Sequence, residues 1–388
     1  MDQLRHALGF MTGTSIDGID AAMIEVTGHG AAMSVRLLRQ VHEPIGDLAG
    51  PLREFARGSR LTAVEVASLA RRLGERHASV FETHFATEPL DIVVVHGQTV
   101  CHAPPDSLQL MNPWPLAAIT PCPVLYDLRG ADLADGGQGA PITPLADAIL
   151  YRDQRDPDTA LAIVNLGGFI NVTLLPRMKT ETDVFDGLAG FDCCPCNHLL
   201  DAAALATIDR PFDQGGEIAA RGTPDASMAS AFGQEIAALF QDGRSGGDGD
   251  EHREDAVAIA RAAKSPADGL ATICQAIGIA LADCITGIAD IACTNRKTGT
   301  DRPLRLILAG GGVLNACLVG AIRDAFPPST EIRTSDELGI PAQARESAGM
   351  ATLGALSLDG VSITAPSITG RRTGRRSGPA IAEIRTPS

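Results

Sequence analysis

Residues 160–175, Ala-Leu-Ala-Ile-Val-Asn-Leu-Gly-Gly-Phe-Ile-Asn-Val-Thr-Leu-Leu, decide the fold of this chain. Two apolar runs of strand length, 160–164 and 172–175, enclose a turn that carries two glycines and two asparagines. The same order of run, polar glycine-containing turn and run occurs near the start of the chain, over residues 7–26. The repeat predicts a duplicated pair of domains, each of which contributes one phosphate-binding turn.

The first turn, residues 12–18, offers several hydrogen-bond donors to a phosphate group. It joins two strands and contains no Gly-Lys-Ser/Thr sequence, so it is not the strand–helix P-loop. A polar hairpin without a ligand is the alternative interpretation. The candidate phosphate ligands are Thr12, Gly13, Thr14, Ser15 and Gly18, and Asp17 could hold Mg²⁺ through water.

The middle of the chain carries a candidate catalytic carboxylate, Asp192, in the stretch Phe191-Asp192-Cys193-Cys194-Pro195-Cys196-Asn197-His198. A helix is predicted to begin near Asn197, and its free N–H groups would favour the ionised form of an aspartate just ahead of it. A poised carboxylate beside a polyphosphate cradle would suit phosphoryl transfer to an alcohol or to an activated water. A helix cap plus a turn, or zinc bound by Cys193, Cys196 and His198, are the alternatives.

Composition limits the class of protein. The 388 residues suggest two domains, and the formal charge of −15 argues against a nucleic acid or an anionic membrane as partner. ATP stays compatible, because backbone amides and a divalent cation can hold phosphate. Nine cysteines, without an apolar signal run after Met1, predict the reducing cytosol. The apolar segment 270–292 contains Gln275, Asp283 and Asp290, which favours a buried helix over a membrane span.

Polar residues follow several predicted strands, a common position for ligand-binding side chains. The buried strand 92–95 ends in His96-Gly97-Gln98-Thr99, and the strand 123–126 leads to the segment 127–132. In that segment Arg129, between Asp127 and Asp132, could clamp a sugar or a carboxylate, or form a surface ion-pair cluster. The strand 304–308 leads to Gly310-Gly311-Gly312, where a flat ring or a phosphate could approach the backbone, and Asn315 would begin a helix.

Three further helices and a tail complete the prediction. A capping box at Thr62 and Glu65 opens a helix to about residue 85, Ser265-Pro266 begins a long helix, and 344–358 forms the last one. Residues 359–388 are rich in Gly, Pro, Ser, Thr and Arg, which predicts disorder. A solvated basic tail is expected from Arg371, Arg372, Arg375 and Arg376.

In this order, the motifs resemble those of the anhydro-N-acetylmuramic acid kinase family, over about residues 8–356. The resemblance implies an α/β fold of two RNase H-like domains of the sugar kinase/Hsp70/actin type with a central cleft. The expected domains are 1–132, joined by the helix 344–358, and 133–343. The matching segments are residues 11–20 and 165–171 (phosphate loops), 96–99, 112–113 and 136–141 (substrate side), 191–193 (catalytic) and 310–315 (adenosine).

The resemblance also implies the reaction: a 1,6-anhydro sugar from cell-wall turnover is hydrolysed and phosphorylated on its 6-oxygen, with ATP and Mg²⁺, by a cytosolic bacterial homodimer. Asp192 would activate the attacking water. Further implied nucleotide ligands are Asn165, Gly167, Gly168, Asn171, Gly310, Gly311, Gly312 and Asn315. The implied sugar ligands are His96, Gln98, Thr99, Asp127, Arg129, Gly137, Gln138 and Glu346.

Three segments of the chain depart from the family pattern. One of them is Arg244-Ser245-Gly246-Gly247, which stands where the family has a Lys-Ser-Thr-Gly-Arg-like segment. Cys194 and Cys196 stand where the family has glycines, so the backbone there must avoid glycine-only angles or be strained. The segment from Asp127 to Gly130 also differs. A kinase for another anhydro sugar, or a sensor that binds ATP and sugar without turnover, are therefore the alternatives.

Overall fold

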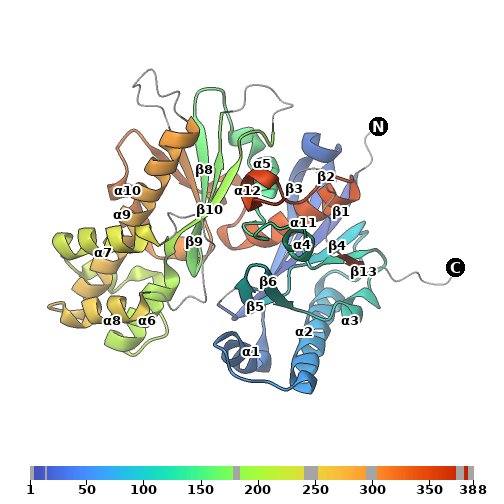
Figure 1. The fold of residues 1–388 in the computed structure, drawn as a ribbon, viewed down its shortest axis with the longest axis horizontal. Coiled ribbons are helices and arrows are strands. Elements are labelled where there is room, and N and C mark those ends of the chain that lie inside the picture. Colours follow the sequence, from blue (N-terminus) through green and yellow to red (C-terminus); the bar gives the residue numbers. More distant parts are fainter. Residues whose placement is uncertain are drawn as a thin grey trace. The chain divides into compact units, whose positions relative to one another are not determined.

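The computed structural model describes residues 4–13, 15–177, 184–239, 252–293, 304–372 and 380–382, so Thr14, residues 244–247, Arg375 and Arg376 lie outside the described residues. The chain divides into two compact units, each with its own β-sheet (Figure 1). Unit 1 comprises Met1–Arg152, Thr180–Asp186 and Ala344–Ser388; unit 2 comprises Asp153–Lys179 and Gly187–Gln343.

The sheet of unit 1 begins with an antiparallel meander. β1 (Arg5–Met11) pairs with β2 (Gly18–Thr27), which pairs with β3 (Ser34–Pro44). On the other side of β1 the sheet continues in parallel, through β4 (Ile92–Val95) and β7 (Val124–Tyr126), before β13 (Ala380–Ala382) adds an antiparallel edge. A separate hairpin, β5 (Gln98–Ala103) and β6 (Asp106–Leu110), follows β4.

The sheet of unit 2 repeats this pattern. β8 (Ala160–Leu166), β9 (Phe169–Leu175) and β10 (Ala189–Pro195) form the antiparallel meander. β11 (Leu304–Ala309) and β12 (Glu331–Thr334) continue from β8 in parallel.

The two sheets thus share one topology, in which the third, second, first, fourth and fifth strands lie in that order. A meander of three strands, extended by two parallel strands beside its first strand, is the arrangement expected for an RNase H-like domain. The predicted α/β class and the duplication are confirmed, because both halves build the same sheet from equivalent strands.

The helices belong to one unit or the other. The predicted capping box is present at the start of α2, where Glu65 N donates to Thr62 Oγ1 (3.3 Å) and Thr62 N donates to Glu65 Oε2 (2.7 Å). Unit 1 contains α1 (Ala49–Ala56), α2 (Ala63–His84), α3 (Trp114–Ala117), α4 (Gly130–Ala134), α5 (Pro144–Leu150), α11 (Arg345–Leu358) and α12 (Pro366–Thr369). Unit 2 contains α6 (Asn197–Ile208), α7 (Ala226–Ala238), α8 (Arg253–Ala262), α9 (Pro266–Cys293) and α10 (Ala316–Ala325).

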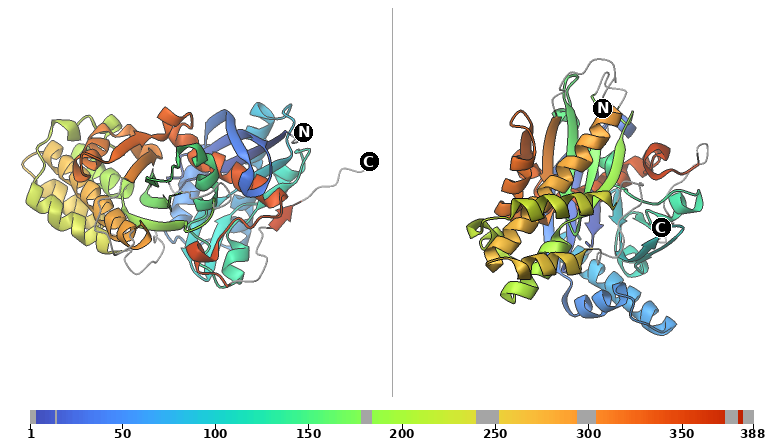
Figure 2. Two further views of the ribbon diagram at one scale, coloured as in Figure 1. Left: turned by 90° about the horizontal axis from the view of Figure 1, so that it is seen from above. Right: turned by 60° about the vertical axis from the view of Figure 1, so that its left-hand side comes forward.

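The long apolar helix α9 is a core element. Among the described residues, Pro266–Thr286 is the one stretch of helix long and apolar enough to cross a membrane, and 72% of its most apolar window is buried. It packs against α7, α8 and α10, and Figure 2 shows these helices lying together in yellow to orange. The predicted buried helix is therefore the better description of this segment.

The boundary expected after residue 132 lies instead after Arg152. The reason is a buried ion pair that joins α5 to α11 within unit 1. Arg345 Nε donates to Asp147 Oδ1 (2.9 Å), Arg345 Nη2 donates to Asp147 Oδ2 and to Thr143 Oγ1 (3.1 Å), and both charged side chains are 1% exposed.

The predicted disorder after residue 358 is wrong for residues 359–372. Asp359 accepts hydrogen bonds from Arg5 Nη1 (2.6 Å) and from Gly30 N (2.7 Å), which ties the end of α11 to the first strands. Arg371, expected in a solvated tail, is only 8% exposed. Composition predicted solvation because it counts polar residues without showing their partners.

Removal of the buried cation tests the α5–α11 connection. Arg345→Met should lower the free energy of unfolding of unit 1 by about 3–5 kcal/mol, because the Asp147 carboxylate is left buried without its cation. Trp114, the single tryptophan of the chain, lies in unit 1, so its fluorescence during urea unfolding reports this unit.

Arg71→Met is the matched control, since its ion pair with Glu75 is half exposed (51% for each side chain) and should contribute less than about 1 kcal/mol. Equal effects of the two substitutions would contradict the structural role of the buried pair.

Candidate active site

The turn between β1 and β2 is held by side chains from neighbouring elements of unit 1. Thr12, 1% exposed, donates from Oγ1 to Gly97 O (2.8 Å), and Gln98 Nε2 donates to Gly13 O (3.3 Å). From α1, Arg53 Nη2 donates to Ile16 O (3.0 Å), at a residue whose φ is +52°. The Thr12 hydroxyl therefore donates its proton inside the protein in this structure, and phosphate binding by Thr12 stays a prediction.

The exposed part of the same turn carries a hydroxyl and a carboxylate group. Ser15 and Asp17 are both exposed, and Ser15 Oγ donates to Asp17 Oδ1 (2.7 Å). A carboxylate beside a hydroxyl, open to solvent, is an oxygen-only donor set of the kind that Mg²⁺ prefers. Gly18 is buried where β2 begins, and a Cβ there would overlap the His42 ring.

His96, at the end of β4, is a neutral imidazole. The side chain is 1% exposed, with Nδ1 3.0 Å from Gly97 O, and its Nε2 accepts from Arg129 Nε (3.2 Å). This pattern assigns the ring proton to Nδ1. Burial, and next the charge of Arg129, lower the pKa of His96 to about 3.

Several other predicted sugar ligands already have protein partners. Arg129 Nη1 donates to Gly139 O (2.7 Å), Thr99 Oγ1 donates to Gln109 Oε1 (2.5 Å), and Gly130 N donates to Asp127 Oδ1 (3.0 Å) at the start of α4. Gln98 is fully buried, and its Oε1 has no hydrogen-bond donor among the described residues.

Glu346 lies in the first turn of α11, half buried, in a field of other charges. Burial raises the pKa of its carboxyl, the neighbouring Arg345 lowers it, and Asp20 raises it further. Asp20 Oδ1 itself lies 2.8 Å from His42 Nδ1. Sequence reasoning did not select Asp20 as a site candidate, although it lies on β2 only three residues after Asp17.

In unit 2 the second turn joins β8 to β9, and the candidate catalytic residue Asp192 lies on β10, the strand next to β9. Asn165 on β8 is paired with Asn171 on β9, and Asn171 is paired with Asp192 on β10. Directly opposed residues point to the same face of a sheet with Cβ atoms about 4.5–5.5 Å apart. The register therefore places Asn165, Asn171 and Asp192 in one row beside the Gly167–Gly168 turn.

The local setting predicted for Asp192 is corrected by this arrangement. Asp192 is a strand residue followed by a bulge at Cys193, and not the residue just ahead of a helix. The N–H groups of Cys196 and Asn197, where α6 begins, donate to Gly168 O (2.8 Å) and Gly167 O (3.1 Å). The helix start therefore holds the glycine turn.

The glycine segment, residues 310–312, follows β11 and packs against Asn165 and Leu166 at the end of β8. Gly310 has φ +83°, and a Cβ there would lie 2.7 Å from Asn165 Oδ1. A Cβ on Gly312 would lie 2.7 Å from the Leu166 Cβ, whereas one on Gly311 would meet no atom within 4 Å. As predicted, Asn315 begins a helix: its Oδ1 accepts from Leu318 N (3.0 Å) as the cap of α10.

The two cysteines that replace family glycines need no glycine-only backbone. Neither has a positive φ, and Cys196 has φ −135°. Both side chains are fully buried in the core of unit 2. The zinc hypothesis is wrong for the described residues, because the sulfurs of Cys193 and Cys196 do not converge with a ring nitrogen of His198, and both thiols lie fully buried in the core of unit 2.

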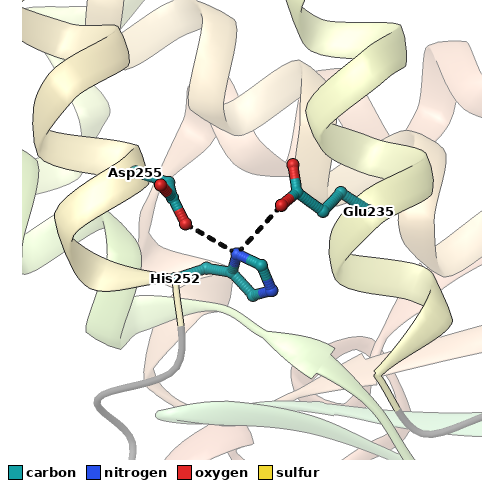
Figure 3. Close-up of side chains that lie close together, drawn as sticks. All are labelled: Glu235, His252 and Asp255. Atoms are coloured by element: carbon teal, nitrogen blue, oxygen red, sulfur yellow. Dashed lines mark hydrogen bonds and ion pairs between the residues drawn. The ribbon is translucent and has the colours of Figure 1, made fainter.

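Within the described residues, one group of three metal-binding side chains does converge, away from the predicted site. Figure 3 shows His252 between Glu235 of α7 and Asp255 of α8, with Nδ1 3.5 Å from Glu235 Oε1 and 2.8 Å from Asp255 Oδ2. Both carboxylate side chains are 57% exposed. Contacts of the His252 ring with two carboxylates, one of which (Asp255) lies in the first turn of α8, where the helix dipole favours a negative charge, account for the cluster without a metal.

Comparisons with known proteins identify the family to which a chain with this fold and these turns belongs. A family model described as anhydro-N-acetylmuramic acid kinase matches residues 5–382. A protein of that name from Salinibacter ruber is 31% identical over 387 residues, covering 94% of this chain and 93% of the relative. Another of that name, from Prochlorococcus marinus (strain MIT 9303), is 33% identical over 383 residues, covering 95% and 97%.

Among solved structures, component A of (R)-2-hydroxyglutaryl-CoA dehydratase from Acidaminococcus fermentans is similar over 91% of this chain and 98% of its own, with a TM-score of 0.43 and 13% identity. The relatives and the family model define the protein as a phosphotransferase. The chain belongs to the anhydro-N-acetylmuramic acid kinase family.

A pair of adjacent glycines tests the packing of the glycine segment. Gly310→Ala should lower the free energy of unfolding of unit 2 by about 1–3 kcal/mol or more, because φ +83° with ψ 172° is a conformation that only glycine adopts readily, and because the new Cβ would lie 2.7 Å from Asn165 Oδ1. Gly311→Ala should leave it nearly unchanged, because that Cβ would point into open space. Calorimetric unfolding of both variants measures the difference, and comparable losses would contradict the described packing.

The His96–Arg129 contact has a consequence for titration. NMR of the His96 ring should show a neutral imidazole at pH 5, and Arg129→Met should raise its pKa while burial keeps it below the ordinary value of 6.5. Because the unfolded chain takes up this proton near 6.5 and the folded ring only near 3, His96 costs stability as the pH falls below about 6.5. An unchanged pKa in the variant, with Arg39→Met as control, would show that Arg129 does not act on the ring.

Proposed function

We propose that this enzyme opens 1,6-anhydro-N-acetylmuramic acid with water and phosphorylates its 6-oxygen from ATP, giving N-acetylmuramic acid 6-phosphate in peptidoglycan recycling. Membership of the kinase family supports a sugar and ATP as the substrates. The observation that carries the proposal is the row of Asn165, Asn171 and Asp192 beside the glycine turn of unit 2.

In the proposed reaction Asp192 accepts a proton from the water that attacks the anomeric carbon. The bond between that carbon and the 6-oxygen breaks, and the 6-oxygen forms a bond to the γ-phosphorus as ADP leaves. A carboxylate on a sheet strand suits this role, because the ladder on β9 and the bulge at Cys193 fix the direction of its side chain.

Unit 2 would hold the nucleotide. Asn165, Gly167, Gly168 and Asn171 would bind phosphate oxygens, and Gly310, Gly311 and Gly312 would lie against adenosine. Support comes from the space left by the missing side chain at Gly311 and from the left-handed backbone at Gly310. Asn315 would act mainly through its cap of α10, which holds the end of the glycine segment.

Unit 1 would supply the remaining groups. The first turn would bind phosphate oxygens through Gly13, Ser15 and Gly18. Asp17 in the same turn would hold Mg²⁺ through water, and the ion, when bound, would screen the phosphate charges. On the sugar side, neutral His96 and buried Gln98 would orient polar groups of the substrate. Arg129 and Glu346 would offer opposite charges, and the remaining sugar ligands would be Thr99, Asp127, Gly137 and Gln138.

The biological setting is part of the proposal. A cytoplasmic homodimer in a bacterium would fit the family, and the net charge of −15 gives no reason to add a nucleic acid or a membrane as partner. Light scattering during size-exclusion chromatography measures the oligomeric state, and a monomer at micromolar concentration would remove the dimer from the proposal.

The central test is a coupled assay with ATP, Mg²⁺ and 1,6-anhydro-N-acetylmuramic acid. We expect formation of ADP together with a sugar 6-phosphate, detected by mass spectrometry. Asp192→Asn should cut turnover by about 10²–10⁴-fold, the range for loss of a general base, with ATP binding retained.

Asp209→Asn is the control, because this carboxylate lies at the end of α6 with φ +54°, a conformation that asparagine also adopts. Absence of ADP and of the phosphate product in the wild type would exclude the proposed reaction. Near-normal turnover of Asp192→Asn would exclude only the role of Asp192. Turnover with a different anhydro sugar in a substrate panel would identify another substrate.

A further inference from the structure

The C-terminal arm, defined here as residues 362–372, lies along the loop of residues 136–139 in unit 1. Gln138 N donates to Thr369 O (2.8 Å), and Arg372 N donates to Asp135 O (3.1 Å). A segment remote in sequence thus supplies backbone partners to the loop that carries the candidate sugar ligands Gly137 and Gln138.

Asp132 connects the arm to the loop. It is 1% exposed; Oδ1 accepts from Thr369 Oγ1 (2.8 Å) and Oδ2 accepts from Gly139 N (2.8 Å). Asp132 also forms an ion pair with Arg371, whose Nε lies 3.6 Å from Oδ1. A buried carboxylate is stable only when it has hydrogen bonds and an opposite charge, so the arm completes the environment of Asp132.

The arm also fixes Arg371 itself. Arg371 Nε donates to Thr364 Oγ1 (3.1 Å), and Nη2 donates to Ser362 Oγ (3.1 Å) and to Thr364 O (3.0 Å). With its guanidinium held by several acceptors and its side chain 6% exposed, the charge stays against Asp132.

From Asp132 the connection continues to the sugar side. The loop residue Gly139, whose N–H binds Asp132, offers its carbonyl to Arg129 Nη1 (2.7 Å), and Arg129 Nε donates to His96 (3.2 Å). Asp132 also packs directly against Gly137 of the same loop, since a Cβ at Gly137 would overlap Asp132 Oδ2. A shift of Asp132 would therefore move Gly139 and release one of the anchors of Arg129.

We propose that Arg371 is a positioning residue for the sugar: through Asp132 it fixes Gly139, and thereby the guanidinium of Arg129 beside His96. The identity of the ligand rests on the proposed function, whereas the connection from Arg371 to His96 does not. The C-terminal arm, residues 362–372, is thus a structural part of the sugar side of unit 1.

Kinetics of the full-length enzyme test the proposal. Arg371→Met should raise the KM for the anhydro sugar about tenfold, the effect of roughly 1.4 kcal/mol, and leave the KM for ATP within about twofold. Arg371→Lys should restore part of the loss. Arg372→Met is the matched control, because the side chain of the next residue is exposed. Equal changes of both KM values, or an equal effect of Arg372→Met, would overturn the proposal.

Hydrogen–deuterium exchange gives a readout that needs no catalysis. Exchange in residues 129–139 should become at least about tenfold faster in Arg371→Met and unchanged in Arg372→Met, because the Gly139 N–H loses a fixed acceptor. If Arg371→Met fails to fold, Thr369→Val, which removes one hydrogen bond to Asp132, carries the same expectation. Unchanged exchange would overturn the positioning role; faster exchange in an enzyme without sugar kinase activity would overturn only the proposed function.

Discussion

The antiparallel pairing of the first three strands in each unit is the constraint on which the candidate site depends. In unit 2 the register of β8, β9 and β10 sets Asn165, Asn171 and Asp192 opposite one another. Side chains in such a row share one face of the sheet, so their direction is determined by the backbone ladder. A slip of one residue would turn Asp192 to the other face. The bulge at Cys193 leaves Asp192 in register and shifts only the pairing of the later residues of β10.

The same topology lets each unit join a hairpin turn to the end of its fourth strand. In unit 1 the Thr12 hydroxyl binds Gly97 O after β4, and in unit 2 Gly310 after β11 packs against Asn165. Different groups thus hold the hairpin turn against the segment after the fourth strand: a threonine hydroxyl in unit 1 and a closely packed glycine in unit 2. The unit 1 segment carries the polar side chains of Gln98 and Thr99, whereas the unit 2 segment is glycine, with open space around the Cβ position of Gly311.

Much of the fold could be predicted from local patterns. Apolar runs and helix caps are short-range signals, so the elements that they predict lie where the sequence indicated. Examples are the strand 92–95, the capping box at Thr62 and the helix that begins at Ser265-Pro266. The setting of Asp192 could not be predicted: strand pairing turned the residues before α6 into β10, and local reasoning placed them in a turn. The zinc hypothesis failed similarly, since the spacing of Cys193 and Cys196 does not show that both thiols enter a core.

By itself the sequence determined the α/β class, the duplication and the glycine turns, because these depend on residue type and on spacing within a few positions. Only the tertiary structure decided that Arg371 is buried beside Asp132, and that Arg345 pairs with Asp147 across 198 positions. Composition predicted a solvated Arg371, and no local sequence pattern singled out Arg345. Their partners come from remote segments, and the cost of burying a charge is met only when those segments have folded together.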